Sequence, residues 1–147
     1  GSINQVNSFC CENLRKNHYF GKLMDRLSLH QKPSKCFFNN RWSLISALSK
    51  FGSTVVSNQI NNELNYLYLE LLHLGIPLIH NSEPLKEVGY YYPDFDLDSG
   101  AKQLKLAIET HENELNWYKG HARSFLQKYS PYNDKNISIY RDLIKCI

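Results

Sequence analysis

The sequence predicts an α/β fold in which an open parallel sheet is flanked by helices. Helix-like and strand-like segments alternate along the first half of the chain, which is typical of crossover connections between parallel strands. The strand-like segments are short apolar runs without polar alternation, as expected for strands covered on both faces. With 147 residues, the chain is long enough for one domain with a core. We therefore expect one Rossmann-like domain over residues 3–147, leaving out Gly1-Ser2, which resembles the remnant of a cleaved tag.

Apolar spacing and chain breakers define the elements of the first half. Residues 8–29 carry apolar side chains at helical spacing and predict a helix that ends before a break at Pro33. Short apolar runs predict three strands, at residues 36–38, 54–56 and 76–79. Two further helices are predicted, each stopped by a glycine: residues 42–51 before Gly52, and residues 62–74 before Gly75.

The second half is predicted to be mostly helical. Residues 84–88 fit one helical turn, and residues 90–92 fit a short extended segment closed by Pro93. An acidic turn leads into three helices, at residues 100–111, 112–129 and 133–146, with Asp98 or Ser99 as cap of the first and a break at Ser130-Pro131.

Composition narrows the function classes. The formal net charge is +3, and the cations are spread along the chain rather than clustered as in nucleic-acid-binding domains, so no nucleic-acid partner is expected. No apolar run reaches the ~18 residues of a membrane span. Cys10, Cys11, Cys36 and Cys146 form no C-x-x-C pair, so we expect reduced thiols in a cytoplasmic protein.

Polar loops follow the three predicted strands, at residues 39–41, 57–61 and 80–82. In an open parallel sheet these loops share one edge, where ligands bind. Their Asn, Gln, Ser and His side chains suit the hydroxyls of a sugar or ribose. The alternative is that Asn and Ser simply favour turns.

Single residues suggest finer roles, each with a structural alternative. Arg41 is placed to bind phosphate oxygens, and the N-terminus of the helix at 62–74 favours an anion. Glu70 lies on that helix as a ribose ligand or as a solvent-facing carboxylate. His80 is a candidate general acid or base, or a structural histidine. The run Tyr90-Tyr91-Tyr92 offers rings for stacking, or an ordinary strand of alternating exposure.

Familiar catalytic and metal motifs are missing from the sequence. Asp94, Asp96 and Asp98 resemble part of a calcium loop but lack its glycine and distal glutamate, so no metal site is expected. The sequence contains no P-loop, no G-x-G-x-x-G, no nucleophile elbow and no H-E-x-x-H.

A family resemblance covers roughly residues 37–130. Residues 70–79, ELLHLGIPLI, resemble the E-A-L-A-x-G-x-P-V-[IV] segment in the C-terminal, nucleotide-sugar-binding half of GT-B glycosyltransferases. Together with residues 55–57, 64–69, 77–82 and 89–96, they also resemble a little-characterised glycosyltransferase-like family.

That resemblance implies an NDP-sugar-binding domain. Glu70 matches the glutamate that binds the nucleotide ribose, and residues 80–82 match the segment near the donor phosphates and sugar. Asn62 stands where an acidic residue often faces the donor sugar, with Glu63 beside it, and Arg41 falls near the nucleotide base. The candidate donor-binding residues are Arg41, Asn58, Gln59, Asn62, Glu63, Asn65, Tyr66, Glu70, His80, Asn81 and Ser82.

The implied reaction transfers a sugar from an NDP-sugar to a glycan or other acceptor. GT-B catalysis takes place between two Rossmann-like domains, so the acceptor would bind a preceding domain, and this domain alone would be inactive. The resemblance implies no metal and no cofactor besides the donor, and it assigns no catalytic residue. A non-catalytic nucleotide- or carbohydrate-binding module and a structural interaction domain remain alternatives.

Overall fold

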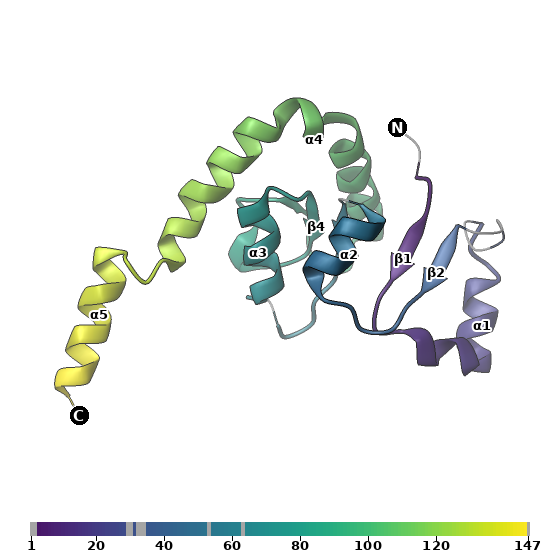
Figure 1. Ribbon diagram of the computed structural model, residues 1–147, viewed down its shortest axis with the longest axis horizontal. Coiled ribbons are helices and arrows are strands. Elements are labelled where there is room, and N and C mark those ends of the chain that lie inside the picture. The colour runs from purple at the N-terminus through teal and green to yellow at the C-terminus, as the bar shows by residue number, and fades with distance from the viewer. Residues whose placement is uncertain (1–2, 29–30, 32–34, 53, 63, 147) are drawn as a thin grey trace. The chain divides into compact units, whose positions relative to one another are not determined.

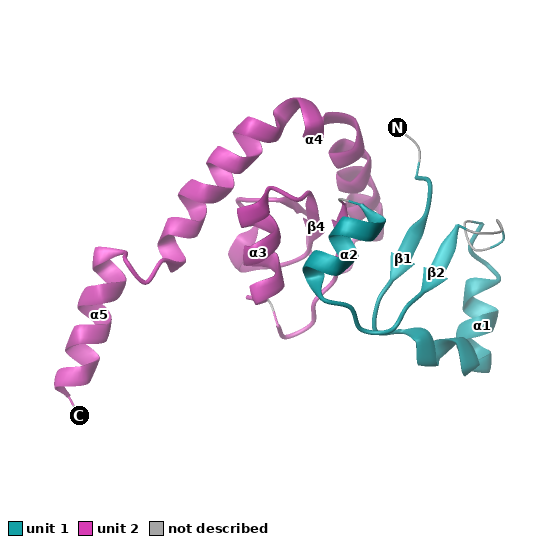
Figure 2. Cartoon of the chain, viewed as in Figure 1, with its two compact units in different colours: residues 1–53 teal, residues 54–147 magenta. Residues whose placement is uncertain are grey.

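The computed structural model describes residues 3–28, 31, 35–52, 54–62 and 64–146. The chain divides into two compact units, Gly1–Ser53 and Thr54–Ile147, coloured separately in Figure 2. Each unit combines short parallel strands with helices (Figure 1), so the predicted α/β class is confirmed. The strands form two sheets, one in each unit, rather than the single sheet expected from the sequence.

Unit 1 contains a two-stranded parallel sheet. Its elements are β1 (Val6–Ser8), η1 (Glu12–Lys16), α1 (His18–Met24), β2 (Cys36–Phe38) and α2 (Leu44–Phe51). The register places Val6 opposite Cys36. None of the described residues of this unit is fully buried, and the rings of Phe9, Trp42 and Phe51 form its aromatic cluster, with centroids 5.0–6.4 Å apart.

The single helix predicted for residues 8–29 is wrong. Strand β1, the 3-10 turn η1 and helix α1 occupy that region. Cys10 has a positive φ of 59°, and the Asn17 side chain accepts hydrogen bonds from the backbone N–H groups of Tyr19 and Phe20. An asparagine that caps in this way marks the start of a new helix. The apolar residues before and after Asn17 therefore do not belong to the same helix. The predicted break at Pro33 lies outside the described residues.

Helix α2 has the glycine stop that the sequence predicts. The Ser43 hydroxyl accepts from the backbone N–H of Ser46, so the helix begins at Leu44 instead of Trp42. Gly52, with φ 104°, ends it, and its N–H donates to the Leu48 carbonyl.

Unit 2 contains a three-stranded parallel sheet in the order β3-β4-β5. Its elements are β3 (Val55–Val56), α3 (Tyr66–Leu74), β4 (Leu78–His80), η2 (Glu83–Leu85), β5 (Tyr90–Tyr91), α4 (Leu97–Leu126), η3 (Gln127–Tyr129) and α5 (Asp134–Lys145). All three residues of the central strand β4 are buried, and helix α4 packs against α3, β4 and β5. The strands predicted near residues 54–56, 76–79 and 90–92 are therefore present, and all run parallel.

Helix α3 begins later than predicted. The Asn65 side chain accepts from the backbone N–H of Leu67, so the first helical residue is Tyr66 instead of Asn62. The predicted stop is confirmed, because Gly75 adopts a left-handed φ of 74° at the C-terminal end. An added Cβ at Gly75 would also require the exposed side chain of Lys119 to move, but the left-handed φ is the main reason for glycine at this position.

Helix α4 replaces the two helices predicted for residues 100–129. Asp96, rather than Asp98 or Ser99, is its cap, since its carboxylate accepts from the Ser99 N–H. No proline or glycine lies next to the predicted boundary between His111 and Glu112. The backbone hydrogen bonds of one helix therefore continue through it.

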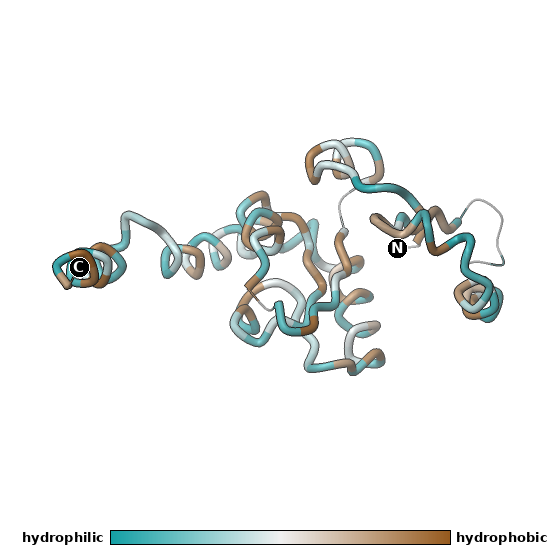
Figure 3. The backbone as a smooth tube through the Cα atoms, turned by 90° about the horizontal axis from the view of Figure 1, so that it is seen from below, coloured by the Kyte–Doolittle hydropathy of each residue, from teal (hydrophilic) through white to brown (hydrophobic). Residues whose placement is uncertain are grey.

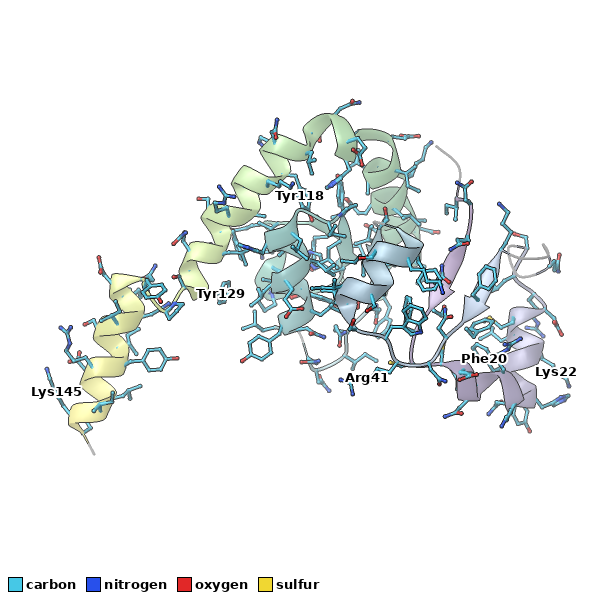
Figure 4. All side chains as sticks on the ribbon, in the orientation of Figure 1. Phe20, Lys22, Arg41, Tyr118, Tyr129 and Lys145 are labelled. Atoms are coloured by element: carbon cyan, nitrogen blue, oxygen red, sulfur yellow. The ribbon has the colours of Figure 1, made fainter. Side chains whose placement is uncertain are left out.

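Two side chains of α4 hold the turn that precedes β4. His111 Nε2 donates to the Gly75 carbonyl at 3.1 Å, and its Nδ1 accepts from the Tyr90 hydroxyl at 3.2 Å. The Tyr118 hydroxyl, labelled in Figure 4, donates to the Ile76 carbonyl at 3.0 Å. Burial raises the pKa of the Tyr118 phenol, so it stays a neutral donor. These bonds fix where β4 starts and therefore where its carboxyl end lies.

Candidate functional site

The carboxyl ends of β3, β4 and β5 bring three polar segments to one edge of the unit 2 sheet. The parallel register pairs Val56 with Ile79, and His80 with Tyr91. Ser57, Asn81 and Tyr92 therefore follow the three strands at the same edge. This is the edge at which open α/β sheets bind ligands.

Six neutral side chains form a hydrogen-bonded group there, which we call the edge cluster: Ser57, Asn58, Gln59, Tyr68, Asn81 and Tyr92. The Tyr68 hydroxyl donates to Ser57 Oγ at 2.8 Å. Asn58 Nδ2 donates to the Tyr92 hydroxyl at 3.1 Å, and that hydroxyl donates to the Ser57 carbonyl at 3.3 Å. The cluster thus offers hydroxyls and amides without fixed charge, a set suited to neutral hydroxyl groups of a ligand.

Asn81 joins the two loops of the cluster. Its Oδ1 accepts from the Gln59 backbone N–H at 2.8 Å, and its Nδ2 donates to the carbonyls of Gln59, at 2.9 Å, and Asp94, at 3.1 Å. Both amide protons are therefore used within the protein. Asn81 shapes the site, and only its carbonyl oxygen retains capacity to accept a further hydrogen bond.

Tyr68 holds the edge cluster in place through its hydrogen bond to Ser57. Its side chain is fully buried on α3, and burial raises the pKa of its phenol above the ordinary 10.0. A protonated phenol donates to Ser57 throughout the physiological pH range. Ser57 Oγ also lies 3.4 Å from Gln59 Nε2, as an acceptor, so the position of its hydroxyl is fixed by two neighbours.

His80 is the last residue of β4, and hydrogen bonds inside the protein hold its imidazole in place. The side chain is fully buried, its Nε2 donates to the Val88 carbonyl at 2.8 Å, and its Nδ1 accepts from the Ser82 N–H at 3.2 Å. Burial lowers the pKa of the imidazole below 6.5. With both ring nitrogens bonded inside the protein, the geometry favours the structural alternative for His80 over the general acid or base. Ser82 is also fully buried.

The remaining predicted residues fall into distinct places. Asn62 is exposed and reaches the cluster through Gln59 Oε1, at 3.5 Å. Asn65 caps α3, and Tyr66 and Glu70 are exposed on the same helix.

Two predicted residues lie elsewhere. Arg41 is exposed and belongs to unit 1, after β2. Glu63 lies outside the described residues.

The candidate donor-binding residues did not include Ser57, Tyr68 and Tyr92, although Ser57 lies in the predicted edge loop 57–61 and Tyr92 in the tyrosine run considered for stacking. Ser57 follows a predicted strand directly, so its position at the loop entrance was a usable signal. Tyr68 stands among apolar residues at helical spacing, which indicates core rather than site. A buried tyrosine nevertheless needs a hydrogen-bond partner for its hydroxyl. The polar loops on either side of the helix contain such partners and were therefore a usable signal.

Neither metal ligands nor membrane spans were found among the described residues. No three His, Cys, Asp or Glu side chains come together there as a metal site. None of the helices in the same part of the chain combines the length and apolar character needed to cross a membrane.

Fold and cluster together describe an α/β protein with a neutral hydrogen-bonding site at the carboxyl edge of a parallel sheet. The chain belongs to the DUF2827 family, described as a protein of unknown function, whose model matches residues 1–144. No curated protein and no solved structure matches the chain significantly.

Proposed function

We propose that unit 2 binds the nucleotide-sugar donor of a glycosyltransferase, and that the whole protein transfers the sugar to a glycan or other acceptor. The observation that carries this proposal is the edge cluster at the carboxyl ends of three parallel strands. The GT-B-like segment at residues 70–79 supports it, because that segment runs from α3 into β4 and so borders the same edge.

The cluster suits the sugar and ribose parts of such a donor. Ser57 and Gln59 offer a hydroxyl and an amide in fixed positions, and such groups both donate to and accept from ligand hydroxyls. Glu70 is exposed on α3, so its carboxylate is free to accept from a ribose diol. Arg41 belongs to unit 1, and the proposal for unit 2 does not rest on it.

A non-catalytic nucleotide- or carbohydrate-binding module is the second candidate. Among the described residues, the hydrogen bonds of the edge cluster include no carboxylate side chain, and both nitrogens of His80 are bonded within the fold. Among the described residues, the edge cluster therefore offers binding groups but no carboxylate or free imidazole as a general base. This observation favours donor binding in unit 2, with any catalytic base supplied elsewhere.

Calorimetric titration with UDP, GDP and ADP tests the proposal. We expect binding of at least one nucleotide. Glu70→Ala should weaken it roughly tenfold or more, because hydrogen bonds to a carboxylate contribute about 1.5–3 kcal/mol. Glu109→Ala removes an exposed carboxylate from α4 and serves as the matched control. Absence of binding at millimolar nucleotide, with the protein folded, would refute donor binding.

A second variant asks whether the edge cluster itself forms the site. Tyr68→Phe removes the hydroxyl that fixes Ser57 and should weaken nucleotide binding roughly threefold to tenfold, equivalent to one hydrogen bond of about 1 kcal/mol. Unchanged affinity in this variant would move the site away from the cluster. A glycosyl-transfer assay on the full-length protein then separates an enzyme from a binding module.

A further inference from the structure

Helix α5 is an amphipathic helix without a single buried residue. Five apolar side chains on it are 37–71% exposed: Ile137, Ile139, Tyr140, Leu143 and Ile144. Figure 3 shows this helix end-on, with apolar and polar residues around its axis. At about 100° per residue, the five apolar positions share one arc of roughly 160°, which also contains Asn136.

The charges of α5 are ordered around that arc. Lys135 borders it on the side of Ile139, and Arg141 borders it on the side of Ile137, each roughly 40° away. The opposite side carries Asp134, Asp142 and Lys145, and Lys145 Nζ lies 3.5 Å from the Asp142 carboxylate. Cations therefore flank both borders of the apolar face, while the acidic residues lie away from it or are paired.

The helix is short and has little support of its own. Asn133 caps it, and Asn136 Nδ2 donates to the carbonyls of Lys128 and Ser130, both at 2.9 Å. Twelve residues are at the margin of what forms a stable helix in water. Figure 4 labels Tyr129 before the helix and Lys145 at its end, with the α5 side chains between them. A surface that covers the apolar face would stabilise this helix.

The size of the face limits what that surface is. A helix of this length extends for about 18 Å and is about 10 Å wide. Its twelve residues are fewer than the roughly 20–30 that each partner contributes to a stable protein interface. A second copy of the chain, pairing through α5 alone, is therefore disfavoured.

We infer that α5 docks in the plane of an anionic lipid surface. The apolar face would enter the boundary between headgroups and acyl chains, and Lys135 and Arg141 would reach the anionic headgroups from its two borders. Tyr132 is 87% exposed in the turn before the helix, and Tyr140 lies within the apolar face. Such tyrosines suit the interface between water and lipid. This inference is independent of the proposed function of the edge cluster.

Co-sedimentation of the full chain with vesicles tests the inference. We expect binding to phosphatidylcholine vesicles with roughly a third phosphatidylglycerol, weaker binding to pure phosphatidylcholine, and a gain of helical circular dichroism with the anionic vesicles. Replacing Lys135 and Arg141 by alanine together should lower the affinity by about twenty-five-fold at low salt, about fivefold for each cation.

Two variants that add the same charge separate the apolar face from overall charge. Ile144→Asp should lower binding more than tenfold, whereas Ser138→Asp, on the opposite polar side, should lower it only severalfold. Because α5 has no buried residues, neither variant should change the thermal unfolding of the protein.

Three results would overturn lipid docking. The first is absence of binding to anionic vesicles, and the second is an equal loss of binding in both aspartate variants. The third is a dimer in analytical ultracentrifugation that Ile144→Asp dissociates, because this would assign the face to a second copy of the chain.

Discussion

The Asn81 amide offers the sharpest test of how the edge cluster is built. Asn81→Asp keeps the shape of the side chain and the oxygen that accepts from the Gln59 N–H. It replaces Nδ2 by a carboxylate oxygen, which would then face the carbonyl oxygens of Gln59 and Asp94 at the present distances of 2.9 and 3.1 Å. Two donated hydrogen bonds become two repulsive contacts.

The structure sets the size of the effect. Each lost hydrogen bond contributes about 1 kcal/mol, and a negative oxygen held against two carbonyls adds to that loss. We expect the free energy of unfolding to fall by about 2–4 kcal/mol at pH 7. For a chain of 147 residues the midpoint of thermal unfolding should fall by roughly 6–13 °C. As pH falls toward about 4 the difference should narrow, because the two carbonyls raise the pKa of the new carboxyl in the folded state and its protonated form regains one donor.

Urea unfolding, followed by circular dichroism at several pH values, measures this difference. Asn62→Asp is the matched control, since Asn62 is exposed and its only described side-chain hydrogen bond is 3.5 Å long. The control should stay within about 0.5 kcal/mol of the wild type. A loss below 1 kcal/mol for Asn81→Asp, or a loss equal to that of the control, would show that Asn81 does not hold the two loops together.

Two further predictions concern the residues beneath the cluster. Burial lowers the pKa of His80, so the unfolded chain binds more protons than the folded one, and stability should fall as pH drops below about 6.5; His80→Gln should flatten that acid slope in pH-dependent urea unfolding, and an unchanged slope would assign it to other groups. Gly89→Ala should destabilise by about 1–3 kcal/mol, because φ is 73° and the new Cβ would lie 2.8 Å from His80 Nε2. Gly120→Ala is its control: nothing lies within 4 Å of that Cβ, so this change inside α4 should stabilise by about 0.5–1 kcal/mol, and a similar loss in both variants would refute the steric argument.

Local signals predicted the ends of several elements correctly. Gly52 and Gly75 stop their helices with positive φ, and Ser130-Pro131 separates α4 and η3 from α5. Starts were less accurate, because Asn17 and Asn65 cap helices inside stretches whose apolar spacing continues through them. A side-chain cap outweighs the spacing of apolar residues over one turn.

Strand pairing depends on contacts that a sequence pattern does not encode. The run at residues 36–38 was recognised as a strand, but its partner β1 (Val6–Ser8) was not predicted and overlaps the predicted helix only at Ser8. Strands β3 and β5 each consist of two β-branched or aromatic residues. Such short segments become strands only because β4 lies beside them. Partner choice is a tertiary property, so the two sheets could not be predicted from local preference.

The sequence predicted loop residues of the candidate site, but it did not predict the helix residue Tyr68. Asn58, Gln59 and Asn81 follow strands, and the structure joins them in one cluster. Tyr68 contributes through a hydroxyl at the end of a buried ring, and its position in an apolar pattern conceals that role. His80 shows the opposite case, since a polar residue after a strand proves to be fully buried.

The distribution of buried residues has a consequence for local unfolding. The described part of unit 1 has no fully buried residue, whereas every residue of β4 in unit 2 is buried. Regions with few buried apolar contacts open at low free energy, while core strands open only with the whole cooperative unit. Backbone amides of unit 1 should therefore exchange with deuterium long before those of β4. A protease acting on the native protein would cleave within unit 1 before it cleaves the sheet that carries the edge cluster.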